Sequence, residues 1–430
     1  MQKLLLALLA LLARAIIDFH KPIVIGITGT VGKTTVTSHV YGYLSYALPN
    51  KRIWYSKYHY NGEYGLPLTI IWARTGGKNP ILWIWVFIVG LSRFFRSYPE
   101  YLVLEYGIDH PGEMDFLTSI VVPDVAILTE VAPNHLEQFG TLERYRTEKL
   151  KLIRDAKDLI IHDSLRSYVE REAFFYGAGW MSDIDIADVH LDMNWTRGVV
   201  NFHRTTYPIA IRAFWWFHLV NTLPLYALSH IFSLDTKQVA EYIVTVEWEP
   251  GRSSLLSGKY GTKIIDGSYN WWYLSLHAGI LSLESFLPEN RLICIIWDMR
   301  ELGADTEKIH IQLATEIAES YQSLWEYVRF YLVWPHMQKY VAPILGMNFH
   351  TEVFFSSRDA WNTVLRYLDS SESPEKNIIF VKWSQNTIFL EEAIEILLEN
   401  REDTKKLCRQ SEDWKRKKED FFSTLWASRV

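Results

Sequence analysis

Cysteine is scarce in this chain: its 430 residues contain only Cys294 and Cys408. A disulfide framework is therefore excluded in practice, and the usage suits a reducing cytoplasm. Neither cysteine has metal-site spacing. A long basic block is also missing and the formal net charge is −6, which argues against nucleic acid as a partner. Internal repeats and low-complexity tracts are absent, so the length predicts two or three ordinary domains.

Apolar runs long enough to cross a membrane are lacking too, because a spanning helix needs about 20 apolar residues. The run at 4–17 is interrupted by Arg14 and predicts a helix that packs on the protein or lies on a membrane surface. Its Ala-Arg-Ala is only a loose match to a signal cleavage site. The run at 81–91 is followed by arginines and suits a membrane interface or a buried helix. Residues 1–18 and 81–96 are thus candidates for peripheral contact with the inner face of the plasma membrane.

The most informative segment that is present reads Gly29-Thr30-Val31-Gly32-Lys33-Thr34-Thr35. It follows a β-branched run and precedes a helix-compatible run, which is the strand–turn–helix context of a phosphate-binding loop. In such a loop backbone N–H groups wrap a phosphate, Lys33 reaches the terminal phosphates, and Thr34 offers its hydroxyl to Mg²⁺. The strict pattern wants glycine at Ile27, whereas Gly26 lies one place earlier. The context nevertheless predicts ATP binding.

Alternating strands and helices predict an α/β architecture. Buried parallel strands are expected at 101–105, 124–129 and 158–162, a helix at 142–153, a less regular region at 164–207, and helices at 215–232 and 235–244. After a hinge at 250–254, strands are expected at 263–266, 291–297, 328–333 and 377–382, and a charge-dense solvated helix at 400–420. We therefore expect an apolar N-terminal helix (1–20), a central ATP-binding domain (21–252) and a C-terminal α/β domain (253–430).

Two residues follow neighbouring strands of the central domain. Glu105 ends a buried strand, and ligands bind at the carboxyl ends of strands in open α/β sheets. Glu105 is therefore placed to hold Mg²⁺, or else to cap the next turn. His135 follows the next strand along the chain, so its imidazole is placed to face the same metal, or else it is an ordinary surface or core histidine of a loop. Lys149, taken alone, reads as a solvated helix lysine.

Taken together, these residues resemble the Mur ligases, which use ATP to form amide bonds in peptidoglycan precursors. The likeness is greatest to the MurF type, which adds D-alanyl-D-alanine. The motifs that carry it stand in the family's order at 29–35, 61–69, 104–113, 135–140, 250–252, 266–270, 298–303 and 382–384. The resemblance runs from about residue 22 to residue 400. It implies a P-loop Mur-ligase central domain, with a mostly parallel sheet flanked by helices, and a Rossmann-like C-terminal domain.

The resemblance also implies roles for individual residues. Lys33 would act on the phosphates, and Mg²⁺ (two ions) would be held by Thr34, Glu105, His135 and Lys149, the lysine being converted by CO₂ into a carbamate. The nucleotide would be bound by the turn at 29–35 together with Asn221, Arg252, Asp266 and Asn270. Substrate contacts are implied for Asn61, Asp298, Lys382 and Ser384.

The chain departs from the MurF pattern in ways that concern the acceptor. Some twenty residues precede the first expected strand, where MurF-type enzymes carry a domain that holds the UDP-sugar, so a partner chain is one expected source of that pocket. Of the family's Gly-His-Asn-x-x-Asn block only Asn221 clearly survives, and Trp383 replaces a glycine. The function expected is addition of D-Ala-D-Ala to a muramyl tripeptide through an acyl phosphate. The alternatives are a folylpolyglutamate-like or cyanophycin-like ligase, a ligase for a lipid-linked acceptor, and an NTPase without ligase activity.

Overall fold

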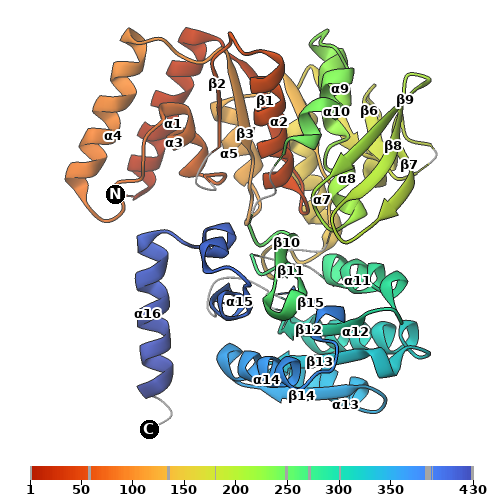
Figure 1. Cartoon of the computed structure of the whole chain (residues 1–430). Helices are drawn as coiled ribbons and strands as arrows, with labels where there is room; N and C mark the ends of the chain where they lie inside the picture. Colours follow the sequence, from red (N-terminus) through yellow and green to blue (C-terminus); the bar gives the residue numbers. More distant parts are fainter. Residues whose placement is uncertain are drawn as a thin grey trace. The chain divides into compact units, whose positions relative to one another are not determined.

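The computed structural model describes residues 2–56, 60–132, 136–179, 181–246, 250–269, 273–299, 302–382, 389 and 391–427. The chain divides into two compact units, each of which is described by itself (Figure 1). Unit 1 comprises Met1–His190, Arg197–Ile211 and Trp216–Val246. Unit 2 comprises Leu191–Thr196, Arg212–Trp215 and Glu247–Val430. The boundaries 20/21 and 252/253 expected from the sequence stay predictions.

Unit 1 contains a nine-stranded sheet in the order β2-β3-β1-β4-β5-β6-β7-β8-β9. The pairs from β2 to β7 are parallel. Its strands are β1 (Ile23–Thr28), β2 (Ile53–Tyr55), β3 (Tyr101–Glu105), β4 (Val125–Leu128), β5 (Asp158–His162), β6 (Phe174–Gly177), β7 (Ile184–Leu191), β8 (Thr196–Phe202) and β9 (Thr205–Ile211). Strands β1, β3, β4 and β5 are almost wholly buried, as near-continuous apolar runs in a parallel sheet require.

Helices of unit 1 cover this sheet (Figure 1). They are α1 (Gln2–His20), α2 (Lys33–Ala47), α3 (Gly65–Ile71), α4 (Pro80–Ser92), α5 (Glu113–Ile120), α6 (Leu136–Phe139), α7 (Leu142–Leu150), α8 (Trp216–Val220), α9 (Pro224–Ile231) and α10 (Lys237–Val244). The apolar side of α1 enters the core through Leu9, Ala13 and Ile16, so the N-terminal helix packs on unit 1. Among the described residues, no helix combines the length and apolarity needed to cross a bilayer.

Unit 2 contains a six-stranded sheet in the order β10-β11-β15-β12-β13-β14, parallel apart from the antiparallel pair β10–β11. Its strands are β10 (Ser254–Ser257), β11 (Lys263–Gly267), β12 (Arg291–Trp297), β13 (Val328–Val333), β14 (His350–Phe354) and β15 (Asn377–Lys382). Its helices are α11 (Tyr273–Ser282), α12 (Thr306–Ser320), α13 (Ala342–Leu345), α14 (Ser357–Asp369), α15 (Glu391–Leu397) and α16 (Glu412–Ala427).

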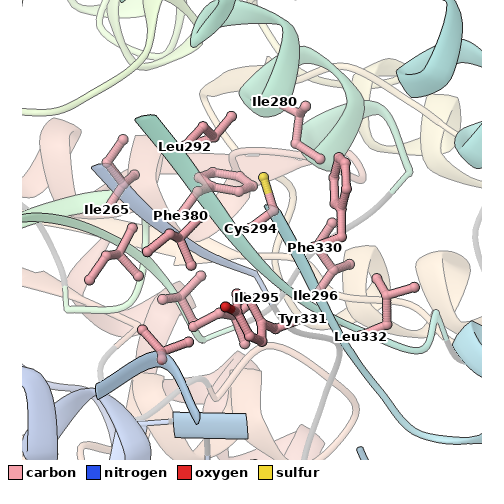
Figure 2. Close-up of a cluster of buried hydrophobic side chains, with 14 of the residues drawn as sticks. Ile265, Ile280, Leu292, Cys294, Ile295, Ile296, Phe330, Tyr331, Leu332 and Phe380 are labelled. Atoms are coloured by element: carbon pink, nitrogen blue, oxygen red, sulfur yellow. The ribbon is translucent and has the colours of Figure 1, made fainter. Parts of the chain in front are cut away.

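The core of unit 2 is built from the central strands of its sheet. Figure 2 shows side chains of β12, β13 and β15 gathered with Ile280 of α11. Cys294 lies in this cluster, where burial raises the pKa of its thiol, so it serves as a small apolar side chain. Phe214 belongs to the same cluster, and Trp215 packs against Gly279 of α11.

The α/β architecture predicted from the sequence is confirmed, with two mostly parallel sheets. Strands β3, β5, β12, β13 and β15 have the predicted bounds. The region at 164–207, expected to be less regular, instead supplies β6 to β9. The helix expected at 215–232 is broken after Val220, because Pro224 begins a second helix.

The solvated helix expected at 400–420 is wrong in two respects. The segment is a short 3₁₀ helix at Arg401–Lys406 followed by a separate helix, α16. Lys418 of α16 is buried, and its amine lies 3.3 Å from a carboxylate oxygen of Glu391 and 2.8 Å from one of Glu392. A buried lysine of this kind is held by paired carboxylates, which a count of charges along the sequence does not reveal.

Candidate functional site

At two positions in the turn between β1 and α2, the backbone has a conformation that only glycine adopts readily. Gly29 has φ 141° and Gly32 has φ 84°, and L-residues with a side chain are strained at such positive values. Space is also lacking, because a Cβ at Gly29 would overlap Thr129 and one at Gly32 would overlap the side-chain oxygen of Asn221. The two glycines are therefore needed for both backbone conformation and packing.

The structure also explains Gly26, which does not belong to the turn. It lies within β1, and a Cβ there would come 2.9 Å from Pro123 and Tyr106. Close packing in the sheet accounts for this glycine. The turn that follows β1 thus begins at Gly29.

The N-terminus of α2 faces this turn with no side-chain cap on its Gly32 N-cap position. Helix α2 has 15 residues, and the first N–H groups of an α-helix, which lack an acceptor within the helix, attract anions. The amine of Lys33 donates to the carbonyl of Thr30 at 3.3 Å, so the lysine folds back over the turn. The amide of Thr30 donates to the carbonyl of Glu130 at 2.8 Å, which fixes the turn to the segment after β4.

Glu105 lies at the carboxyl end of β3, beside the phosphate turn. It pairs with Ile27 of β1, two residues before Gly29, and is only 2% exposed. The side-chain amide of Asn61 donates to the carboxylate of Glu105 at 2.9 Å, and the backbone amide of Glu105 donates to Ser56 Oγ at 3.0 Å. Asn61, implied above as a substrate contact, therefore lies where it orients Glu105.

Lys149, which reads in isolation as a solvated lysine, is 1% exposed near the end of α7. Burial lowers its pKa well below the usual value, and the charge of Lys33 lowers it further. Carboxylates of Asp109, Glu105 and Glu113 act in the opposite direction. The amine lies 4.7 Å from the centroid of the Tyr145 ring. Lys33, Glu105 and Lys149 are thus brought into one electrostatic neighbourhood.

Glu148 joins two helices next to these residues, and sequence reasoning missed this contact. Glu148 accepts from the amides of Gly112 at 2.9 Å and Met114 at 3.2 Å, and it pairs with Lys151 at 2.8 Å. It thereby ties the start of α5 to α7, the helix that carries Lys149. Its position beside Lys149 in the sequence was the available signal, but a neighbouring acid and base on a helix normally read as surface charges.

A cavity of about 350 Å³ lies within unit 1, a volume in the range of small-molecule sites. Its walls come from the end of β2, from the segment before α3, from α3 and from the residues after it: Tyr55, Tyr60, Leu68, Thr69, Trp72, Ala73 and Arg74. Trp72 stacks on Trp54 with ring centroids 4.4 Å apart, and Arg93 lies over the Trp54 ring. The cavity combines aromatic rings with one guanidinium, and sequence reasoning did not identify it.

Unit 2 brings Asp266 and Lys382 together on neighbouring strands, where Gly267 pairs with Lys382. Both side chains are buried, and burial raises the pKa of Asp266. Burial lowers the pKa of Lys382 to about 7, with Asp266 opposing that shift and Arg252 adding to it. The lysine amine lies 5.1 Å from the Trp215 ring, and Arg252 lies over the ring of Tyr269.

Other predicted residues have structural surroundings or lie outside the described part of the chain. Asp298 accepts from the amides of Met337 at 2.7 Å and His336 at 3.2 Å, so its carboxylate caps the segment after β13. Asn221 contacts the phosphate turn at Gly32. Predicted residues outside the described ranges are His135, Asn270 and Ser384. Within the described ranges, no group of three His, Cys, Asp or Glu side chains could hold a metal ion.

Comparison with known proteins identifies the family of the central segment. Residues 27–174 match the family model described as the Mur ligase middle domain. The UDP-N-acetylmuramoyl-tripeptide–D-alanyl-D-alanine ligase of Bacillus subtilis is 25% identical over 313 residues, which cover 71% of this chain and 63% of the relative. The family-model match assigns residues 27–174 to the Mur ligase middle domain.

Solved structures of Mur ligases share the fold. MurF from Acinetobacter baumannii aligns with a TM-score of 0.73 at 17% identity, covering 91% of this chain and 80% of that one. A MurF ligase from Thermotoga maritima, in complex with ADP, aligns with a TM-score of 0.71 at 22% identity, covering 93% and 84%. The chain spans less than two thirds of the length of the Bacillus relative. The predicted combination of central and C-terminal ligase domains is confirmed at the level of the fold.

Proposed function

We propose that this protein is an ATP-dependent amide ligase that activates a carboxylate as an acyl phosphate and captures it with an amine. The single observation that carries the proposal is the cluster of Lys33, Glu105 and Lys149 beside a helix N-terminus. A carboxylate and an amine do not condense at useful rates in water, because oxide is a very poor leaving group. Phosphorylation solves this by turning that oxygen into phosphate.

The first step transfers phosphate to the acceptor. A carboxylate oxygen of the acceptor attacks the γ-phosphorus of ATP, the bond to the β–γ bridging oxygen breaks, and ADP leaves. Charge on the transferring group needs cations and N–H donors fixed in advance. Lys33 and the uncapped start of α2 are the groups of unit 1 that suit this role. The amine then attacks the acyl carbon and phosphate leaves, with loss of one proton from nitrogen.

Magnesium fits the oxygen donors of unit 1. Mg²⁺ takes oxygen ligands and is usually held by one or two carboxylates together with substrate phosphates and water. Glu105, oriented by Asn61, supplies such a carboxylate, and Thr34 in the first turn of α2 supplies a hydroxyl. His135 remains a predicted ligand. A bound Mg²⁺ would neutralise charge on the phosphates during transfer.

Lys149 suits conversion to a carbamate. Only an unprotonated amine adds CO₂, forming an N–C bond and releasing a proton, so that a cation is replaced by an anion. Burial favours the neutral amine of Lys149, and the neighbouring charge of Lys33 favours the anionic product. We therefore keep carbamylated Lys149 as a proposed ligand for a second Mg²⁺.

For the substrates we propose a muramyl tripeptide and D-Ala-D-Ala, which is what the Bacillus relative's name states for that protein. The cavity beside α3 is the proposed acceptor pocket, because Tyr60 of its wall precedes Asn61, the partner of Glu105. A lipid-linked acceptor is the second candidate. It is favoured by the exposed apolar side chains of α4, among them Trp85 at 62% exposed.

A product assay by mass spectrometry tests the proposal. Purified protein, ATP and Mg²⁺ are incubated with a panel of acceptors and amines, and phosphate release is followed in parallel. Release that requires both substrates supports a ligase, whereas release without an acceptor would leave only an NTPase. Lys33→Ala should abolish turnover with its fold retained, and Lys51→Ala, which changes an exposed lysine paired with Glu100, is the matched control.

Carbamylation has its own test. Activity lost after removal of dissolved CO₂ should return with bicarbonate, and ¹³C-bicarbonate should give a carbamate signal that Lys149→Ala removes. Full turnover by Lys149→Ala would end this part of the proposal and leave the role of Lys33 standing.

A further inference from the structure

Helices α1 and α4 lie side by side on unit 1 (Figure 1). Their contact is close, since Gly90 of α4 lies against the side chain of Leu12 of α1. Phe19 at the end of α1 also meets Phe94, with ring centroids 5.3 Å apart. The two helices therefore form one continuous piece of surface, called here the α1/α4 surface (residues 4–19 and 81–95).

Each helix exposes a second apolar face. On α1 the exposed side chains include Leu4, Leu8 and Leu11, which recur every three to four residues and so share one side of the helix. On α4 they include Ile81 at 72% and Trp85 at 62% exposed, and Phe95 just beyond the helix is 90% exposed. Isolated exposed apolar residues are ordinary, but a contiguous group of this kind marks an interaction surface.

The charges carried by the two segments of this surface are almost all of one sign. Residues 2–21 and 74–96 together carry seven lysines and arginines and a single acid, Asp18. That acid lies 3.8 Å from Arg14 on the same helix. Helix α4 itself has no charged residue, and exposed basic side chains stand at its ends, such as Lys78 and Arg96. This local excess of positive charge stands in a chain whose net charge is −6.

We infer that the α1/α4 surface docks on the face of an anionic lipid bilayer. Apolar and aromatic side chains would enter the headgroup boundary, and the surrounding lysines and arginines would meet lipid phosphates. Helices that lie in the interface need no spanning length, which agrees with the 13 residues of α4. A second copy of the chain fits less well, because a two-fold contact would press two basic rims together.

This inference goes beyond the proposed chemistry and does not depend on it. Binding to lipid needs neither ATP nor an acceptor, so the two proposals can fail separately. Docking would hold unit 1, with its cavity beside α3, at the membrane surface.

Vesicle co-sedimentation of the full chain tests the inference. Phosphatidylcholine vesicles with about 30% phosphatidylglycerol should bind the protein, and pure phosphatidylcholine vesicles or high salt should weaken binding severalfold, because electrostatic attraction is screened. The double variant W85S/I88S, which removes two exposed apolar side chains of α4, should lose about tenfold or more of the affinity. Its matched control is I311S/W325S, which removes an exposed isoleucine and tryptophan from unit 2.

Three results would overturn the inference. The first is the absence of binding to anionic vesicles by wild-type protein. The second is binding that W85S/I88S and I311S/W325S weaken equally. The third is a concentration-dependent dimer in light scattering that W85S/I88S dissolves while vesicles bind nothing. Circular dichroism and thermal melting establish that each variant is folded. A second variant, K78Q/R96Q, leaves the apolar side chains in place and is expected to lose affinity for anionic vesicles only.

Discussion

Replacing Gly32 by alanine should separate backbone strain from crowding in the phosphate turn. Gly32 has φ 84°, and an L-residue in the left-handed region costs about 1–2 kcal/mol. The added methyl group would also overlap the side-chain oxygen of Asn221, and overpacking of this kind costs about 1–3 kcal/mol. Together, G32A should lower the free energy of unfolding of unit 1 by about 2–5 kcal/mol.

Gly77 provides the matched control. It has φ 54°, and a Cβ there meets nothing within 4 Å, so G77A carries the backbone cost alone, about 1–2 kcal/mol. For domains of 150–250 residues each kcal/mol corresponds to about 2–4 °C in Tm. The double variant G32A/N221A should recover part of the loss, because the overlapping oxygen is gone. A double-mutant cycle should therefore give a coupling of about 1–3 kcal/mol between the two positions.

Thermal and urea unfolding measure these differences, and calorimetric titration with ADP measures the turn itself. Displacement of the turn by the added methyl group should weaken nucleotide binding in G32A, with G77A unchanged. The reasoning is refuted if G32A costs no more stability than G77A. It is refuted equally if the effects of G32A and N221A add to within about 0.5 kcal/mol.

Two further predictions concern buried charges. In urea unfolding, Glu148→Gln should destabilise unit 1 by about 1–3 kcal/mol, because two amides and Lys151 lose a charged partner. The control Glu143→Gln changes a carboxylate that is 63% exposed, so it should change stability by less than about 1 kcal/mol. Equal effects of the two substitutions would contradict the role of Glu148 in joining α5 to α7. Burial lowers the pKa of Lys382 to about 7, so above that pH the unfolded chain binds a proton that the folded chain does not. The stability of the wild-type protein should therefore rise, relative to that of Lys382→Met, as the pH goes from about 7 to about 9. A difference in Tm that is independent of pH would exclude the shift.

The sequence allowed the central strands to be predicted because they are uninterrupted apolar runs, as at β12 and β13. It also located the phosphate turn, since glycine spacing and the following lysine and threonine are local signals. Strands β6 to β9 were not recognised as a group, because β7 and β9 are only partly buried and polar residues interrupt their apolar runs. The break at Asn221 in the helical region was missed for a different reason, since helical periodicity continues on both sides of it.

Burial was the property that local reasoning could not supply. Lys149 and Lys418 both lie in charge-rich helical segments, yet both are almost completely buried. Their environments are made by residues distant in sequence, namely Glu105 for Lys149 and Glu391 for Lys418. The resemblance to Mur ligases drew attention to Lys149, whereas nothing in the sequence distinguished Lys418 from its neighbours.

The path of the chain between the two units limits how this protein can be divided into fragments. The backbone passes from one unit to the other after residues 190, 196, 211, 215 and 246, so no single cut yields two intact halves. A gene fragment ending at 252 would encode Phe214 and Trp215 without the helices and strands that enclose them. Residues 191–252 contribute to both units, so split-reporter designs and domain exchange between ligases should keep this segment together with both of them.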